Sequence, residues 1–364
     1  MFENVKRNFG FGCMRLPMKD GEVDKEETNK MVDAFIEAGF NYFDTAHGYI
    51  DGKSEHAVRD CLTSRYDRER YVLADKLSDW FFKTEAEVRP FFESQLKICG
   101  VEYFDFYLFH ALNRNSYQKH KECNTFAIVD ALHREGKVKH IAMSFHDTAD
   151  VLDMILTEQP QIEVVQLQIN YLDYDDPDVQ SKLCYDVAVK HGKKVIVMEP
   201  VRGGALVNLP PEAIAEFNAL GDAKPVSYAL RYAASFPEVF MVLSGMGNMD
   251  MVCENIKIMH PFVPLSDKEF AATDRAREMI RKYKQIPCTK CNYCAEICPK
   301  NVPISELFAI YNEHVLAQAT RQDASMKLKA FDVKASDCID CGGCEKICPQ
   351  NIGIREHLKK LAKF

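Results

Sequence analysis

Short apolar runs alternate with helix-like stretches from residue 8 to about residue 260. In KEETNKMVDAFIEAGF apolar residues recur at helical spacing, whereas YFDFYLFHA is a nearly continuous apolar run of strand length. Eight such strand–helix repeats predict a parallel sheet covered by helices. Eight repeats in about 250 residues favour a closed (β/α)8 barrel, the TIM-barrel class of α/β fold, over a doubly wound sheet. The expected strands lie within residues 7–16, 41–46, 70–77, 103–111, 138–146, 162–170, 193–201 and 238–246.

The glycine-rich stretches argue against the doubly wound alternative. GFGCMR, which begins at Gly10, and GMGNMD, which begins at Gly245, both lack the third glycine of the dinucleotide fingerprint G-x-G-x-x-G. A nucleotide site of that kind is therefore not expected in this chain.

Eight of the 14 cysteines form two runs, CTKCNYCAEICP and CIDCGGCEKICP, with the spacing C-x2-C-x2-C-x3-C-P. This is the spacing with which bacterial ferredoxins hold 4Fe–4S clusters. Zinc bound by four cysteines is the alternative, but a repeated run with a trailing proline is more specific for clusters. In two-cluster domains the fourth cysteine of each run ligates the other cluster. One expected ligand set is Cys288, Cys291, Cys294 and Cys348, and the other is Cys338, Cys341, Cys344 and Cys298.

These runs define the domain organisation that we expect. Residues 1–263 form the barrel, residues 264–285 a charged helical connector, and residues 286–364 a small iron–sulfur domain. Cys338 follows Cys298 by 40 positions, and the intervening ISELFAIYNEHVLAQA has helical spacing. The C-terminal domain should therefore be a mostly helical ferredoxin-like domain.

Composition narrows the class of protein further. A net charge of −8 argues against nucleic acid as a partner. The N-terminal stretch lacks the apolar core of a signal peptide, and no apolar run is long enough to span a membrane. The other six cysteines are scattered singly, which is typical of buried thiols in a cytoplasmic chain. We therefore expect a cytoplasmic protein with no nucleic-acid or membrane partner.

Polar residues follow three consecutive expected strands. Asp44 and Tyr49 come from FDTAHGY, Lys76 from LADK and His110 from FYLFH. Each residue alone has an ordinary interpretation, as a helix cap, a surface lysine or a core histidine. Together they predict one site, because barrel chemistry lies at the carboxyl ends of the strands. A lysine held by an aspartate would help a tyrosine to give a proton to a carbonyl oxygen, while a histidine orients that oxygen.

At these residues the chain resembles the aldo-keto reductase family, in the branch that carries a fused C-terminal 4Fe–4S domain. The motif D-T-A-x-x-Y, followed by G-x-S-E at residues 52–55, carries the resemblance. It implies that Asp44, Tyr49, Lys76 and His110 are the catalytic tetrad, and that NAD(P)H supplies hydride to a small carbonyl substrate or accepts it from an alcohol.

The resemblance also implies a set of cofactor-binding residues. Phe145 stands where the family usually has an asparagine, and Met198 where many members have a stacking tyrosine. Gly245 and Met251 replace basic residues that bind the 2′-phosphate of NADPH, so NADH should bind at least as well as NADPH. The cofactor-binding residues expected are Ser144, Gln166, Met198, Gly203, Gly204, Gly245, Glu254 and Asn255.

Two alternatives remain open at this point. The barrel could be a scaffold for an electron-transfer module that no longer turns over carbonyls, or the clusters could be purely structural. The favoured interpretation is an oxidoreductase whose two 4Fe–4S clusters exchange single electrons with the barrel site or with a ferredoxin or flavoprotein partner.

Overall fold

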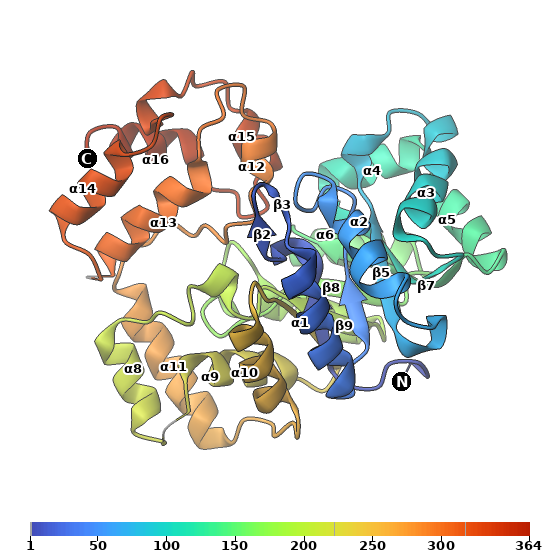
Figure 1. Ribbon diagram of the computed structural model, residues 1–364, viewed down its shortest axis with the longest axis horizontal. Coiled ribbons are helices and arrows are strands. Elements are labelled where there is room, and N and C mark those ends of the chain that lie inside the picture. The colour runs from blue at the N-terminus through green and yellow to red at the C-terminus, as the bar shows by residue number, and fades with distance from the viewer. Residues whose placement is uncertain (1, 222, 317) are drawn as a thin grey trace. The chain divides into compact units, whose positions relative to one another are not determined.

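The computed structural model describes residues 2–221, 223–316 and 318–364. The chain packs as two compact units (Figure 1). One unit comprises Met1–Pro200 and Leu230–Pro264, and the other comprises Val201–Ala229 and Leu265–Phe364.

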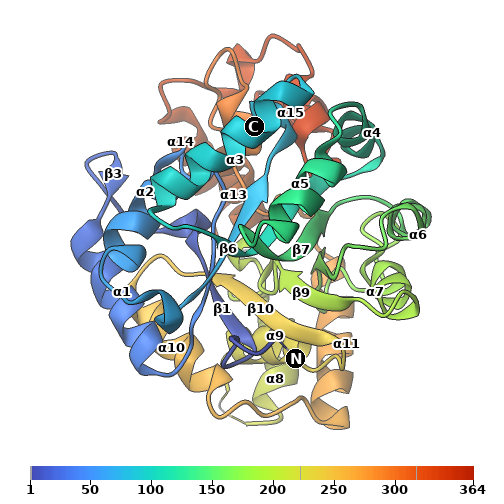
Figure 2. The same ribbon diagram turned by 90° about the vertical axis from the view of Figure 1, so that its right-hand side faces the viewer.

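The first unit contains a closed barrel of eight parallel strands, which confirms the expected fold class. Each strand overlaps one of the expected apolar runs. Figure 2 shows the strands with helices arranged around them. The barrel strands are β1 (Phe9–Gly12), β4 (Tyr42–Asp44), β5 (Val72–Leu77), β6 (Phe104–Leu112), β7 (Val138–Phe145), β8 (Val164–Gln168), β9 (Lys194–Met198) and β10 (Val239–Gly245).

The helices of this unit follow the strands in the expected alternation. Their apolar faces are buried, as in α1, where Met31, Val32, Phe35 and Ile36 face inward. The helices are α1 (Lys25–Glu37), α2 (Lys53–Val58), α3 (Glu85–Cys99), α4 (Arg114–Glu122), α5 (Thr125–Arg134), α6 (Ala149–Glu158), α7 (Ser181–Lys190) and α10 (Met249–Met259), while α9 (Pro225–Ala234) spans the boundary between the units.

A small hairpin and one helix of this unit were not anticipated from the sequence. The strands β2 (Met18–Lys19) and β3 (Glu22–Val23) form a small antiparallel hairpin. Helix α4 has almost no apolar stripe, because only Tyr117 and His120 are buried. Its start is fixed instead by the side chain of Asn113, which accepts hydrogen bonds from two backbone N–H groups of the first turn.

The second unit is helical, and none of its described residues belongs to a strand. Its C-terminal part has a compact core in which Ile304, Phe308, Ile354 and Leu358 are buried beside Cys294 and Cys344. A mostly helical iron–sulfur domain is therefore confirmed. The helices are α8 (Pro211–Asn218), α11 (Asp267–Arg281), α12 (Tyr293–Glu296), α13 (Ile304–Val315), α14 (Arg321–Lys329), α15 (Gly343–Ile347) and α16 (Ile354–Leu361).

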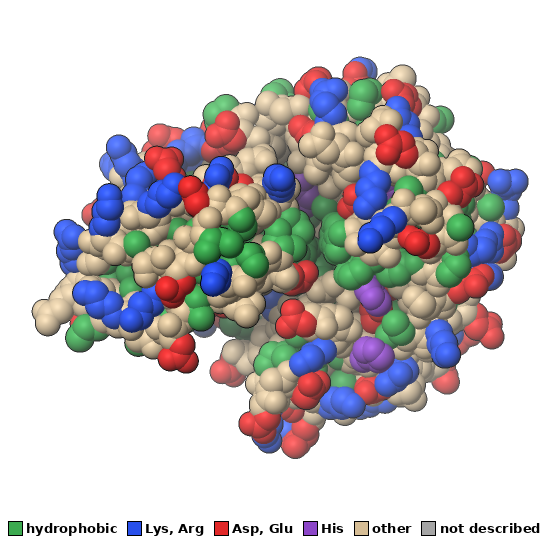
Figure 3. All heavy atoms as spheres, turned by 90° about the horizontal axis from the view of Figure 1, so that it is seen from above, with side chains coloured by type: hydrophobic (Ala, Val, Ile, Leu, Met, Phe, Trp, Pro, Cys, Tyr) green, Lys and Arg blue, Asp and Glu red, His purple; other side chains and the backbone are tan. Residues whose placement is uncertain are grey.

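The described surface shows mixed charge. On the face seen in Figure 3, acidic and basic side chains are interspersed, with hydrophobic side chains between them. That face carries no continuous basic stripe of the kind that binds nucleic-acid phosphates. Every helix among the described residues is too short or too polar to cross a bilayer.

Candidate active site and cluster sites

Four polar side chains lie together at the carboxyl end of the barrel. Asp44 ends β4, Tyr49 lies in the turn after it, and Lys76 and His110 lie near the ends of β5 and β6. Lys76 Nζ donates to Asp44 Oδ1 (2.6 Å) and to the backbone oxygen of Thr45 (2.8 Å). The same Nζ lies 4.7 Å from the centre of the Tyr49 ring, and the Tyr49 and His110 ring centres are 6.0 Å apart. The structure thus brings the four expected residues into one cluster.

The electrostatics of this cluster follow from its burial. The Asp44 and Lys76 side chains are 4% and 1% exposed. Burial raises the pKa of Asp44, and the adjacent Lys76 ammonium opposes that rise. Burial, followed by the Lys76 cation, lowers the pKa of His110 well below its usual value, so this ring is neutral at neutral pH. Perturbed groups of this kind, gathered at one barrel end, mark a functional site.

Strand alternation explains why further expected residues share the same layer. Side chains two positions apart on a strand point to the same side. The buried cluster inside the barrel includes residues from seven strands, among them Tyr42, Ala74, Leu108, Ala142, Val164, Ile196 and Leu243. Two positions further along the same strands lie Asp44, Lys76, His110, Ser144, Gln166, Met198 and Gly245.

Gln166 has a feature that points to a ligand. Its side chain is 3% exposed, yet among the described residues Oε1 has no hydrogen-bond partner. Leaving a buried amide oxygen without a donor costs free energy, so an N–H group of a ligand would fit there. Ser144 Oγ, by contrast, already accepts a hydrogen bond from the backbone N–H of Ala111 (2.7 Å).

The residues expected near the adenosine end of the cofactor lie on β10 and α10. Asn255 is buried and donates to Ser244 Oγ (3.1 Å), while Glu254 is half-buried on the same helix. The stem of Arg15 lies across Gly245, because a Cβ at residue 245 would be 2.9 Å from Arg15 Cδ. Arg15 is a basic residue beside this end of the site that sequence reasoning missed, since it is distant from β10 in the chain.

The G-x-S-E motif has a visible structural role. Glu55 is fully buried; its Oε1 accepts from Gln95 Nε2 (3.0 Å) and its Oε2 bonds to His47 Nδ1 (2.8 Å). Gln95 Nε2 also donates to the backbone oxygen of Lys76 (3.0 Å). Burial, and then the Glu55 carboxyl, raise the pKa of Asp75 well above its usual value. This buried network supports β5 on the side opposite the Lys76 ammonium.

Sequence reasoning also missed a direct partner of the tetrad. Ser78 Oγ lies 2.6 Å from His110 Nδ1, and the Trp80 ring centre lies 5.0 Å from that of His110. The signal was present, because Ser78 comes two positions after Lys76 and so continues the same side of β5.

Gly203 and Gly204 lie in the loop after β9, within the second unit. Both have positive φ, +62° and +93°. A Cβ on Gly203 would lie 2.2 Å from the backbone oxygen of Thr289, whereas a Cβ on Gly204 would meet nothing within 4 Å. Thr289 follows Cys288, so the loop after β9 contacts the first cysteine run.

The eight C-terminal cysteines line two cavities, four cysteines in each. None of the 14 cysteines, all of which lie among the described residues, forms a disulfide bond. Each cavity combines three cysteines of one run with the fourth cysteine of the other, which is the crossed arrangement expected from the spacing. The first is lined by Cys288, Cys291, Cys294 and Cys348, and the second by Cys298, Cys338, Cys341 and Cys344.

The backbone around the two runs repeats. Lys290 and Asp340 have positive φ (57° and 59°), and so do Asn292 and Gly342 (65° and 73°). Backbone N–H groups point at cysteine sulfurs in both runs, from Lys290 to Cys288 Sγ (3.5 Å) and from Asp340 to Cys338 Sγ (3.4 Å). Such N–H groups stabilise thiolates that ligate a cluster. The donor sets and their surroundings therefore fit two clusters.

Comparison with known proteins agrees with this geometry. The profile of the Aldo/keto reductase family matches residues 8–278, and that of the 4Fe-4S dicluster domain matches residues 287–352. The Uncharacterized oxidoreductase YqkF of Bacillus subtilis (strain 168) is 22% identical over 279 residues, which cover 68% of this chain and 85% of that protein. The Aryl-alcohol dehydrogenase (NADP(+)) of Phanerodontia chrysosporium is 40% identical over 62 residues, which cover 17% of this chain and 16% of that protein.

Solved structures share the fold. An aldo-keto reductase from Bacillus halodurans in its holo form is 23% identical, with a TM-score of 0.61, and the match covers 74% of this chain and 91% of that one. An aldo-keto reductase from Klebsiella pneumoniae in complex with NADPH is 21% identical, with a TM-score of 0.60, covering 74% and 95%. The chain belongs to the aldo/keto reductase family, as an oxidoreductase that carries a C-terminal 4Fe–4S dicluster domain.

Proposed function

We propose that this enzyme transfers hydride between NAD(P)(H) and a small carbonyl or alcohol at the Asp44–Tyr49–Lys76–His110 cluster. The observation that carries the proposal is the buried Asp44–Lys76 ion pair (2.6 Å), whose Nζ lies 4.7 Å from the centre of the Tyr49 ring. A fixed cation beside a phenol favours the ionised phenol and so makes the hydroxyl a better acid.

The four side chains then have separate tasks. Tyr49 gives its proton to the carbonyl oxygen during reduction and takes it back during oxidation. Lys76 stabilises the negative charge that remains on the phenol oxygen, and Asp44 holds Lys76 in place. His110, which burial keeps neutral, donates a hydrogen bond to the same oxygen of the substrate.

A nicotinamide cofactor fits the residues that face it in this proposal. The unpartnered Oε1 of Gln166 would accept from the carboxamide, and Ser144 and Met198 belong to the same inward layer. The bound cofactor supplies the hydride, which no side chain of the cluster can provide. Structural relatives in complex with NADPH or NADP support its use here. In the first unit, the proposed positions for the rest of the dinucleotide are Gly245 on β10 and Glu254 and Asn255 on α10. Gly203 and Gly204 belong to the second unit, and their proposed role rests on the family resemblance alone.

We further propose that two 4Fe–4S clusters are bound by the crossed cysteine sets that line the two cavities. The clusters supply one-electron transfer, so a pair of them matches the two electrons of a hydride. A ferredoxin or flavoprotein is the proposed electron partner, and the cytoplasm the proposed location. The proposed functional boundaries are residues 1–263, 264–285 and 286–364.

The test compares two tyrosine variants in anaerobic holoenzyme. Tyr49→Phe should abolish turnover across a panel of aldehydes, ketones and alcohols and leave nucleotide affinity within about twofold, because it removes only the transferable proton. Tyr174→Phe, whose ring packs on Phe236 at 4.9 Å, is the matched control and should retain turnover. Undiminished turnover in Tyr49→Phe would reject this assignment, and a wild-type enzyme that binds no nucleotide would favour the scaffold alternative.

A further inference from the structure

The ring of His110 has a buried hydrogen-bond partner, Ser78, at its Nδ1 atom. Ser78 Oγ lies 2.6 Å from His110 Nδ1, and both residues are buried, at 0% and 3% exposure. Ser78 comes directly after β5, whose Lys76 belongs to the same cluster. The bond therefore joins the ends of two paired strands, β5 and β6.

The direction of this hydrogen bond can be deduced from what Ser78 can reach. A neutral imidazole has one nitrogen that donates and one that accepts, and a hydroxyl can take either role. Within the described residues, His110 Nδ1 is the single partner of the Ser78 hydroxyl. If Ser78 accepted a proton from Nδ1, its own hydroxyl proton would be buried without an acceptor, which is unfavourable. Donation from Ser78 to Nδ1 satisfies both groups.

We propose that Ser78 is a positioning residue, whose hydroxyl donates to His110 Nδ1 and so holds the neutral ring in the tautomer that carries its proton on Nε2. In this tautomer Nε2 is a hydrogen-bond donor, as a residue that orients a carbonyl oxygen must be. The opposite tautomer would present a lone pair to that oxygen. The inference rests on the proposed function, because it explains why His110 donates a hydrogen bond to the carbonyl oxygen in that reaction.

The charge state of the ring agrees with this assignment. Burial and the Lys76 cation lower the pKa of His110 well below its usual value, so the doubly protonated ring does not compete at neutral pH. In a neutral ring, the proton can be on either nitrogen, and the hydrogen-bond partner of Nδ1 determines which nitrogen carries it.

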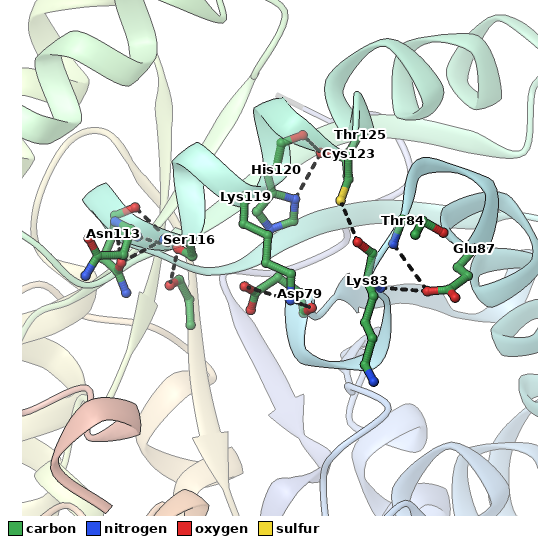
Figure 4. A network of polar contacts seen from close by, with 12 residues as sticks. Asp79, Lys83, Thr84, Glu87, Asn113, Ser116, Lys119, His120, Cys123 and Thr125 are labelled. Carbon is green, nitrogen blue, oxygen red and sulfur yellow. Dashed lines mark hydrogen bonds and ion pairs between the residues drawn. The ribbon is translucent and has the colours of Figure 1, made fainter. Parts of the chain in front are cut away.

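The segment that carries Ser78 is fixed from outside the site. The backbone N–H of Phe81 donates to the oxygen of Ser78 (3.2 Å) and closes a short 3-10 turn. Lys119 on α4 donates to the backbone oxygen of Asp79, and its Nζ lies 3.6 Å from the Asp79 carboxylate (Figure 4). Further along, Cys123 Sγ contacts the backbone oxygen of Lys83 at 3.6 Å. These contacts hold the backbone of the segment that carries Ser78.

Nitrogen-15 NMR of the holoenzyme tests the tautomer directly. In histidine-labelled wild-type protein, the resonances that disappear in His110→Gln should be those of a neutral ring with protonated Nε2 and unprotonated Nδ1. Ser78→Ala should convert this spectrum to a mixture of tautomers, and Ser78→Thr, which keeps a hydroxyl, should restore it. A wild-type ring that carries its proton on Nδ1 would overturn the proposal, even if Ser78→Ala failed to fold.

Measurements of kcat distinguish a positioning role of Ser78 from a purely structural one. Ser78→Ala should lower kcat by about five- to tenfold with little change in nucleotide affinity, which is the effect of losing one hydrogen bond of ordinary strength. Ser181→Ala removes another buried hydroxyl, one that donates to the backbone oxygen of Gln168 (2.6 Å), and should leave kcat unchanged. Equal effects of the two variants would reduce Ser78 to a packing residue. If His110→Gln does not slow turnover, the proposed function fails, while the spectrum still decides the tautomer.

Discussion

Replacing Gly203 by alanine should loosen the first cysteine run and speed the loss of its iron. The residue lies in the loop after β9, and its backbone approaches that of Thr289, next to Cys288. A Cβ at residue 203 would be 2.2 Å from the Thr289 oxygen, 2.7 Å from its carbonyl carbon and 2.9 Å from its Cα. Because all three atoms belong to the backbone, the cysteine run itself must move.

The size of the effect follows from two separate costs. Alanine at a φ of +62° incurs about 1–2 kcal/mol of backbone strain. The steric overlap adds about 1–3 kcal/mol, the usual cost of overpacking. Gly204→Ala is a matched control, since Gly204 also has positive φ (+93°) but its Cβ would meet nothing within 4 Å. The difference between the two variants therefore isolates the contact with Thr289.

Anaerobic iron release to a chelator measures this difference. When reclosing is faster than chelation, the release rate is proportional to the population of the opened state. An extra 1–3 kcal/mol then makes release roughly 5- to 150-fold faster in Gly203→Ala than in Gly204→Ala. Equal release rates, within about twofold, in two variants that both retain full iron content would refute the claim that this contact supports the cluster.

Four further predictions follow from the same structure. Anaerobic protein should contain about eight iron atoms per chain, from two cubanes of four; half that content, or stoichiometric zinc, would contradict the two-cluster proposal. Lys76→Met should destabilise the barrel by about 3–5 kcal/mol in denaturant titrations, because it leaves the Asp44 carboxylate buried without its cation, and Asp44→Asn in the same chain should recover part of the loss. NADH should bind at least as tightly as NADPH in fluorescence titrations, since Gly245 and Met251 offer no cation to a 2′-phosphate; a tenfold NADPH preference that disappears in Arg15→Leu would instead identify Arg15 as that cation. Burial lowers the pKa of His120 to about 3. Because the same ring in the unfolded chain takes up a proton at about pH 6.5, the free energy of unfolding should fall as the pH drops below that value. His120→Leu should reduce the slope of this fall by about 1.4 kcal/mol per pH unit between about pH 6 and pH 4, as measured by denaturant titrations.

The sequence alone determined the barrel and the layer in which its polar residues lie. Apolar runs of strand length, separated by amphipathic helices, leave few other ways to bury both faces of a parallel sheet. Strand alternation has a strict period of two, so a polar residue two positions after a core residue must point the same way. Lys76 after Ala74 and His110 after Leu108 follow this rule. Helix α4 was not predicted, because its apolar residues are too few to give a helical periodicity.

Contacts between residues distant in the chain were decided only by the tertiary structure. The bond from Ser78 to His110, the stem of Arg15 across Gly245 and the approach of Gly203 to Thr289 each join separate segments. Strand alternation indicates the side on which Ser78 lies, but local patterns do not say which atoms meet, because such contacts depend on how strands are staggered and how loops close. The cysteine spacing is an exception, since the short runs limit which sulfurs can meet. For the other sites, the sequence supplied the residue types, and packing decided which atoms lie within reach of one another.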